Sequence, residues 1–267
     1  MITSVVPSYV FFVIGTVIGS FLNVCAYRIP RGESLLFPPS HCAHCGRRIK
    51  TVDLVPLLNF FWLKGRCRFC GGKFGISHPL IELLTGVLFM TACLRFGLTI
   101  ELIKALLLVS VLVVISIIDL EYYIIPNRLI VFVLFLGVVF VIFTGQPTIF
   151  SALIGFGSAF LFLLILALAS RGGMGGGDIK LAAVIGVCLG WPNGPTAVLL
   201  GCLLAGLAGL LLILLRVKNK KDLIPFGPFL AAGTLIMFYS GSQINSWYIK
   251  NVLLLSWLAG ISGRVSW

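Results

Sequence analysis

The stretch "LIGFGSAFLFLLILALASRGGMGGGDIKLAAVIGVCLGW", residues 153–191, joins two apolar segments through a run of glycines that ends in an aspartate. The first apolar segment approaches the roughly 20 residues that an α-helix needs to cross a bilayer. Non-helical backbone inside a membrane is stable only where protein covers it or where it lines a cavity. The stretch therefore predicts two membrane helices joined by a glycine-rich turn, with Asp178 at the start of the second helix.

The rest of the chain shares this apolar character. Of its 267 residues, 59% are hydrophobic and 10% are charged, whereas a soluble domain carries about 25% charged residues. The first apolar segment lacks the positive flank and the small-residue cleavage site of a signal peptide, so we expect it to be retained. The sequence predicts an all-α, polytopic membrane protein with about eight transmembrane helices, at about 5–26, 79–95, 100–118, 127–144, 149–169, 179–190, 194–216 and 224–240.

The basic residues are unevenly distributed between the predicted loops. With eight helices, the loops on one side carry sixteen of the twenty Lys and Arg residues, and the other side carries four. Because an excess of Lys and Arg marks the cytoplasmic side, we expect the long loop of residues 27–78 in the cytoplasm and the N-terminus outside. The net charge of +12 is then mainly a topology signal. No nucleic-acid partner is expected, since no basic patch is interleaved with aromatic residues.

The cytoplasmic loop contains two C-x2-C pairs, each followed directly by glycine. A tight turn of this kind directs two thiolates at one metal ion, and four thiolates suit tetrahedral Zn²⁺. Two disulfides or a redox pair are the alternative, which a reducing compartment disfavours. His41 and His44 lie beside the first pair, but four sulfurs already complete the shell, so we expect both histidines to be solvated. The predicted ligands of a structural zinc ion are Cys42, Cys45, Cys67 and Cys70.

Only eight acidic residues occur in the chain, and Glu82, Asp119 and Asp178 lie close to predicted membrane-buried backbone. Ionisable groups at such positions are costly and indicate a functional site. Asp119 ends the third predicted helix and Asp178 follows the fifth, so both fall at the same predicted cytoplasmic boundary. Two aspartates that share one proton can act as general base and general acid in hydrolysis. We predict that these two are catalytic; the alternative is a flexible turn capped by Asp178.

The glycines before Asp178 support the catalytic interpretation. Gly175, Gly176 and Gly177, together with Gly172 and Gly173, remove side-chain bulk and permit positive φ, so an extended peptide could approach the carboxylate. Asp119 lies at a helix C-terminus and Asp178 at a helix N-terminus. The helix dipoles therefore favour the shared proton on Asp119 and the role of base for Asp178.

Several motifs resemble those of type IV prepilin peptidases, a family of GxGD-type aspartic proteases that are bifunctional leader peptidases and N-methyltransferases. Besides the cysteine pairs, they are "GSFLNVCAYRIPRGES" (19–34), "SHPLIELLTG" (77–86), "IDLEYYIIPNRL" (118–129), "GMGGGDIKLAAVIG" (173–186) and "IPFGPFLAAG" (224–233). The resemblance covers nearly the whole chain. Gly176 is a modest departure, since members often have a bulkier residue before the final Gly-Asp.

The resemblance implies an activity and a location. Asp119 and Asp178 would cut the basic leader peptide from prepilins and pseudopilins at the cytoplasmic face of the bacterial inner membrane. The chain would then methylate the new N-terminal residue with S-adenosylmethionine, because the cysteine-bearing loop belongs to the bifunctional branch. The sequence indicates neither the methyl-donor site nor an oligomeric state. The domains expected are a first membrane helix (1–26), the zinc loop (27–78), the protease core (79–243) and a tail of unknown role (244–267).

Other charged residues have two interpretations each. Glu82 is either an auxiliary carboxylate for substrate positioning or methyl transfer, or a residue whose negative charge is favoured by the helix dipole and which pairs with a polar group such as Asn23. Lys180 is a charge partner at the site or, as we favour, a boundary lysine that reaches the lipid headgroups. Glu33 and Asp53 are expected to be solvated in the cytoplasmic loop. Together with Glu121 they could pair with lysines of a leader.

Two other classes of protein combine similar features. A proton-coupled transporter also buries carboxylates, but usually near the membrane midplane within inverted repeats. A thiol oxidase also combines membrane helices with C-x2-C pairs, but displays them on the outer side. The transporter is the main alternative to the peptidase.

Overall fold

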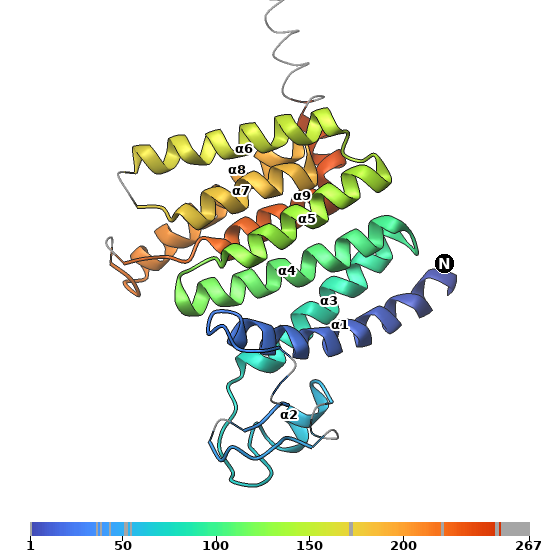
Figure 1. Cartoon of the computed structure of the whole chain (residues 1–267), viewed down its shortest axis with the longest axis vertical. Coiled ribbons are helices and arrows are strands. Elements are labelled where there is room, and N and C mark those ends of the chain that lie inside the picture. The colour runs from blue at the N-terminus through green and yellow to red at the C-terminus, as the bar shows by residue number, and fades with distance from the viewer. Residues whose placement is uncertain are drawn as a thin grey trace, which may run out of the picture. The chain divides into compact units, whose positions relative to one another are not determined.

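The computed structural model describes residues 2–35, 37, 39–42, 44–50, 53, 55–170, 173–219, 222–248 and 251, with the backbone alone at residues 2–6, 61 and 248. These residues are helical apart from loops and two isolated β-bridges. Eight long helices follow in the predicted order (Figure 1): α1 (Ile2–Arg28), α3 (Ser77–Phe96), α4 (Ile100–Tyr122), α5 (Asn127–Thr144), α6 (Ile149–Ala169), α7 (Gly176–Leu189), α8 (Asn193–Leu214) and α9 (Gly227–Tyr248). The all-α prediction is confirmed.

One helix was not predicted, and two boundaries matter for the site. A short helix, α2 (Leu58–Trp62), lies in the cysteine-rich loop. Helix α4 continues four residues beyond the predicted end, so Asp119 lies in its last turn. Helix α7 begins at Gly176, so Asp178 lies in its first turn rather than before it.

Not all of the eight long helices qualify as candidate membrane spans. Within the described part of the chain, six helices are long and apolar enough to cross a membrane, namely α1, α3, α4, α5, α6 and α8. Helix α7 has 14 residues, and at 1.5 Å per residue it reaches about 21 Å, less than the roughly 30 Å of a bilayer core. Residues 181–190 are all buried, so protein surrounds this short helix. The count of about eight membrane helices is therefore approximate: eight long helices are present in the described residues, six of them are candidate spans by length and composition, and the orientation stays a prediction.

The chain forms two compact units, residues 1–129 and 130–267. In the first unit α1 packs along α3, and α4 packs against both. Gly15 and Gly19 lie where α1 crosses α3: a Cβ on Gly15 would lie 2.8 Å from the Cα of Gly86, and one on Gly19 would lie 2.8 Å from the Cα of Glu82. Small residues four apart let two membrane helices approach to backbone contact.

In the second unit α7 packs against α6, α8 and α9. Gly155 of α6 and Gly186 of α7 face each other so closely that a Cβ on either would collide with the backbone carbonyl of the other. Gly194, at the start of α8, meets the same point of α7, with its Cβ position 2.7 Å from the Cα of Gly186. Contacts between glycine backbones thus set the position of the helix that carries Asp178.

Some predicted features lie outside the described residues. They are the apolar part of the tail, 252–261, and the basic residues and glycine at Arg171, Gly172, Lys220, Lys221, Lys250 and Arg264.

We expect Gly155→Val to lower the stability of the protein by about 1–3 kcal/mol, because the added side chain would overlap the backbone of α7. Gly157→Val is the matched control, since nothing lies within 4 Å of a Cβ at that position two residues further along α6. Thermal unfolding of the detergent-solubilised variants measures the difference. Equal midpoints for the two variants would contradict the glycine contact.

Candidate active site and cysteine-rich module

Asp178 stabilises the N-terminus of its own helix. Its Oδ2 accepts a hydrogen bond of 3.2 Å from the backbone N–H of Gly175, and its own N–H donates to the Gly175 carbonyl at 3.1 Å. The first N–H groups of a helix have no partner within the helix, and a negative charge at this end is favourable. The residue is 9% exposed. The carboxylate is therefore held in a defined position at the start of α7.

The glycines next to Asp178 leave free space around the N-terminus of α7. Gly175 and Gly176 are exposed, and nothing described lies within 4 Å of a Cβ position on Gly176. A Cβ on Gly175 would contact only the Asp178 carboxylate, at 3.2 Å, and the backbone of Gly177. The prediction of room beside the aspartate agrees with this arrangement.

The described glycines before Asp178 do not use the positive φ that glycine permits. Gly175 is the extended N-cap residue, with φ −74° and ψ 144°, and Gly176 and Gly177 already belong to the helix. Neither they nor Gly173 are among the described residues with positive φ. The glycines serve here by lacking a side chain, not by adopting a left-handed conformation.

Asp119 is 4% exposed and lies in the last turn of α4. Tyr123, the C-cap residue after α4, has a φ of 57° and donates its N–H to the Asp119 carbonyl at 3.0 Å. The guanidinium of Arg31, in the loop after α1, stacks on the ring of Tyr27 at 3.6 Å and lies 5.5 Å from that of Tyr122. This contact, which the sequence analysis missed, links the loop after α1 to the turn that carries Asp119.

The two aspartates lie in different compact units, Asp119 in the first and Asp178 in the second. Each lies at the helix end that the sequence predicted, and each is buried. Their pairing stays a prediction.

The four predicted zinc ligands converge. The sulfurs of Cys42, Cys45, Cys67 and Cys70 all lie within 4.8 Å of one another, and none is in a disulfide. The Sγ atoms of Cys42 and Cys70 are 3.8 Å apart. Tetrahedral zinc with Zn–S bonds of about 2.3 Å requires sulfurs about 3.8 Å apart. The donor set and its spacing therefore fit one tetrahedral metal ion. His41 and His44 are exposed and stand outside this cluster.

The two cysteine pairs sit on hairpins with the same hydrogen bonds. The N–H of Cys42 donates to the Arg47 carbonyl at 2.9 Å, and that of Cys67 donates to the Gly72 carbonyl at 2.8 Å. A glycine with positive φ follows each pair, with 66° at Gly46 and 70° at Gly71. These are the positions where the turn requires glycine. The local spacing alone thus builds each half of the metal site.

The crowded sulfurs have different proton affinities. The backbone N–H groups of Cys70 and Phe69 lower the pKa of the Cys67 thiol to about 7. At Cys70 the N–H of Gly72 acts in the same direction, but burial and the neighbouring thiols outweigh it and raise the pKa to about 11. Four adjacent thiolates repel one another, and a bound cation removes that cost.

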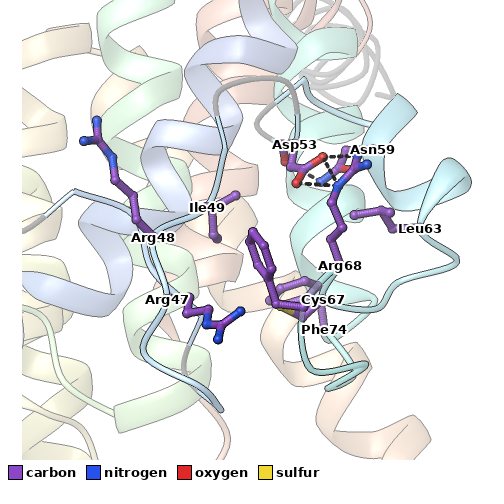
Figure 2. Close-up of a pocket in the computed structure, with 10 residues that line it drawn as sticks. Arg47, Arg48, Ile49, Asp53, Asn59, Leu63, Cys67, Arg68 and Phe74 are labelled. Atoms are coloured by element: carbon purple, nitrogen blue, oxygen red, sulfur yellow. Dashed lines mark hydrogen bonds and ion pairs between the residues drawn. The ribbon is translucent and has the colours of Figure 1, made fainter.

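Asp53 is buried, which corrects the expectation of a solvated residue that could pair with a substrate lysine. The Nε of Arg68 donates to Oδ1 and Oδ2 of Asp53 at 3.1 and 3.0 Å, and Nη2 of Arg68 also donates to Oδ1. The side chain of Asn59 donates to the Asp53 backbone carbonyl (Figure 2). The ion pair raises the pKa of Arg68. Since Arg68 lies between Cys67 and Cys70, Asp53 anchors the second cysteine pair.

Glu82 joins the cysteine-rich module to a membrane helix. Its Oε2 accepts a hydrogen bond of 2.9 Å from the backbone N–H of Leu57, directly before α2. The suggested partner Asn23 donates instead to the carbonyls of Gly19 and His78. Glu82 is 9% exposed and is therefore a docking point for the module. Lys180 is exposed on α7, and its role stays a prediction.

Apolar helices, a buried aspartate next to a glycine-rich turn and a four-cysteine module are the features that the sequence motifs led us to expect. Two family models match the chain: the Bacterial Peptidase A24 N-terminal domain over residues 13–96 and the Type IV leader peptidase family over residues 106–210. The chain belongs to the prepilin leader peptidase family, as the sequence motifs indicated.

Relatives of the chain carry the name prepilin leader peptidase/N-methyltransferase. The protein of Bacillus subtilis (strain 168) is 36% identical over 245 residues, covering 91% of this chain and 98% of the relative. That of Aeromonas hydrophila is 35% identical, covering 91% and 93%, and that of Legionella pneumophila is 32% identical, covering 91% and 96%. No solved structure matches the chain.

We expect Glu82→Ala to loosen the cysteine-rich module, because the N–H of Leu57 loses its acceptor at a cost of about 1–3 kcal/mol. Glu82→Gln keeps an acceptor oxygen, so we expect its loop to be digested at a rate between those of Glu82→Ala and the parent protein. Limited trypsin digestion of the loop, which is rich in Lys and Arg, measures the effect, with Glu101→Ala as control. Digestion at one rate in all four proteins would refute the docking role.

Proposed function

We propose that this chain hydrolyses the leader peptide from prepilins and pseudopilins and then methylates the new N-terminal residue with S-adenosylmethionine. The observation that carries the proposal is the buried Asp178 carboxylate, which accepts a hydrogen bond from the Gly175 N–H. The glycines beside it leave free space where other residues would have side chains. Membership of the leader peptidase family supports both activities.

The two helix ends suggest how the roles divide. The N-terminus of α7 stabilises Asp178 as an anion, which suits a base that removes a proton from water. Asp119 lies at the C-terminal end of α4, where negative charge is disfavoured, which suits a protonated group that donates to the scissile carbonyl oxygen. Water adds to the carbonyl carbon, and the tetrahedral intermediate then breaks its C–N bond. The departing amine takes the proton held by Asp178, and a hydroxyl group of the intermediate returns a proton to Asp119, which leaves a carboxylic acid and restores both aspartates.

The substrate would approach in extended form along the glycine turn. Exposed backbone at Gly175 and Gly176 offers hydrogen-bonding groups without side chains in the way. The chain carries a net charge of +12, so electrostatic attraction would not recruit a basic leader. We infer that the apolar segment of the substrate docks among the membrane helices. Glu33 and Glu121 are exposed and could pair with leader lysines, whereas Asp53 is already bound to Arg68.

The four-cysteine cluster is proposed to hold one structural zinc ion. Four thiolates leave no open position for water, so the ion would stabilise the module without activating a nucleophile. We place this module and the active site on the cytoplasmic side of the inner membrane, with the N-terminus outside, because residues 27–78 alone carry nine of the twenty Lys and Arg residues.

Transport, the alternative function, has no support. The carboxylates that suggested it lie at helix ends, in the last turn of α4 and the first turn of α7, rather than near the middle of a span. The relatives are named as peptidases and methyltransferases.

We expect Asp119→Asn and Asp178→Asn each to reduce leader cleavage by a factor of about 10² to 10⁴, because each removes a group that transfers a proton. Cleavage of a prepilin by the detergent-solubilised protein measures this, with the exposed Asp222→Asn as control. Full activity in either variant would exclude the aspartate pair. If both variants retain activity with the same shift in pH profile, the division of roles is wrong.

We expect one zinc ion per chain in the purified protein. Serine at any of the four cysteines is expected to lower zinc retention, since a tetrahedral thiolate site loses a charged ligand. Elemental analysis after dialysis measures the zinc content. Cys202→Ser, in α8, is the control and should retain zinc fully. Stoichiometric zinc in Cys42→Ser and Cys67→Ser would rule out the cluster as the site.

A further inference from the structure

The segment "VPLLNFFWLKGR", residues 55–66, is an apolar run inside an otherwise polar loop. It contains α2, whose residues Leu58 and Trp62 are one turn apart and therefore lie on the same face. Leu58 is 56% exposed and Trp62 is 78% exposed. Exposed apolar residues gathered in this way usually mark an interaction surface.

The opposite side of α2 is fixed within the module. The ring of Phe60 packs against Gly65, where a Cβ would lie 2.8 Å from it. Leu63 lines the pocket beside Arg68 and Asp53 (Figure 2). The segment is therefore held by its inner side, and the outward position of Leu58 and Trp62 is part of the folded module.

A hydrogen bond places α2 at the edge of a membrane span. The N–H of Leu57 binds Glu82, the sixth residue of α3. At the same level α3 exposes Leu80, Leu83 and Leu84, with 56%, 43% and 51% of their surface accessible. These side chains belong to a candidate membrane span. The lipid-facing surface of α3 therefore includes the helical turn of Glu82, to which the residue before α2 is hydrogen-bonded.

Basic residues complete the surface. Lys64 and Arg66, both exposed, follow Trp62 within four positions. Tryptophan is enriched at the membrane interface because one part of its ring is apolar and the other can hydrogen-bond. Lysine and arginine next to such a position attract acidic lipid headgroups.

We propose that α2 is a membrane-interface anchor, in which Leu58 and Trp62 insert into the headgroup region beside α3 while Lys64 and Arg66 bind acidic headgroups. The anchor and the Glu82 hydrogen bond together hold the cysteine-rich module against the bilayer. Arg68, paired with Asp53, transmits this attachment to the second cysteine pair.

The charges around α2 favour lipid over two other occupants. A basic leader peptide would be repelled by Lys64 and Arg66. A second copy of this chain, packed through the same face, would bring these residues close to their own counterparts. Acidic lipid can contact Leu58 and Trp62 through its apolar part and pair with Lys64 and Arg66 through its headgroup.

Fluorescence in lipid nanodiscs tests the anchor. In the test variant Trp62 is the single tryptophan, with phenylalanine at Trp191, Trp247, Trp257 and Trp267. The control also carries Trp62→Phe and has its tryptophan at an exposed position of the same module, through Lys50→Trp. Because Trp62 lies at the interface, we expect lipids brominated near the headgroup to quench it at least about twofold more than the control. Unfolding midpoints equal to the parent show that both variants are folded.

The same experiment distinguishes the other occupants. Equal quenching of Trp62 and the control would overturn the proposal. A blue shift of Trp62 only on adding a prepilin peptide would assign the surface to substrate, and a shift only in nanodiscs with two chains would assign it to a second copy. Lys64→Glu with Arg66→Glu should reduce the quenching in phosphatidylglycerol but not in phosphatidylcholine. No effect of lipid charge would refute the headgroup contacts. These measurements are independent of catalysis.

Discussion

The contact between the backbones of Gly155 and Gly186 determines where the carboxylate of Asp178 can lie. Helix α7 is too short to cross a bilayer, so its depth is set by the helices around it. A side chain at either glycine would move α7 away from α6. The first unit repeats this construction, because Gly19 of α1 packs directly on the backbone of Glu82. In both units the close approach of two helices positions an acidic residue. Because lipid provides no hydrophobic driving force between membrane helices, this approach depends on how well the helix surfaces fit together.

The cysteine-rich module combines strong local order with a few distant attachments. Its hairpins form through bonds between residues a few positions apart, and the sulfurs then crowd into one cluster. The module is joined to the membrane helices by Glu82, through the N–H of Leu57. From there α2, Asp53 and Arg68 continue to the second cysteine pair. Docking of the module and formation of the metal site are thus parts of one hydrogen-bonded path.

Candidate site residues could be chosen from the sequence because ionisable residues are rare in this chain. An aspartate between apolar segments is costly unless it has a function, which made Asp119 and Asp178 the candidates. The glycines beside Asp178 leave space, as the sequence suggested, but the described ones do not use the positive φ that glycine permits, because the helix already begins at Gly176. Asp53 was misjudged because its partner Arg68 lies 15 residues away. Arg31 stacks on Tyr27, four residues before it, but nothing local in the sequence indicated that it also lies near Tyr122.

By itself the sequence determined the class of protein, the order of the eight long helices and the two cysteine hairpins. Each of these follows from composition or from interactions over a few residues. Only the tertiary structure decided that α7 is enclosed by protein, that Asp53 is buried, and that Glu82 holds the module to α3. These features depend on which distant backbone or side chain completes a hydrogen bond or fills a space. Spacing along the chain carries no information about such partners until the helices have packed.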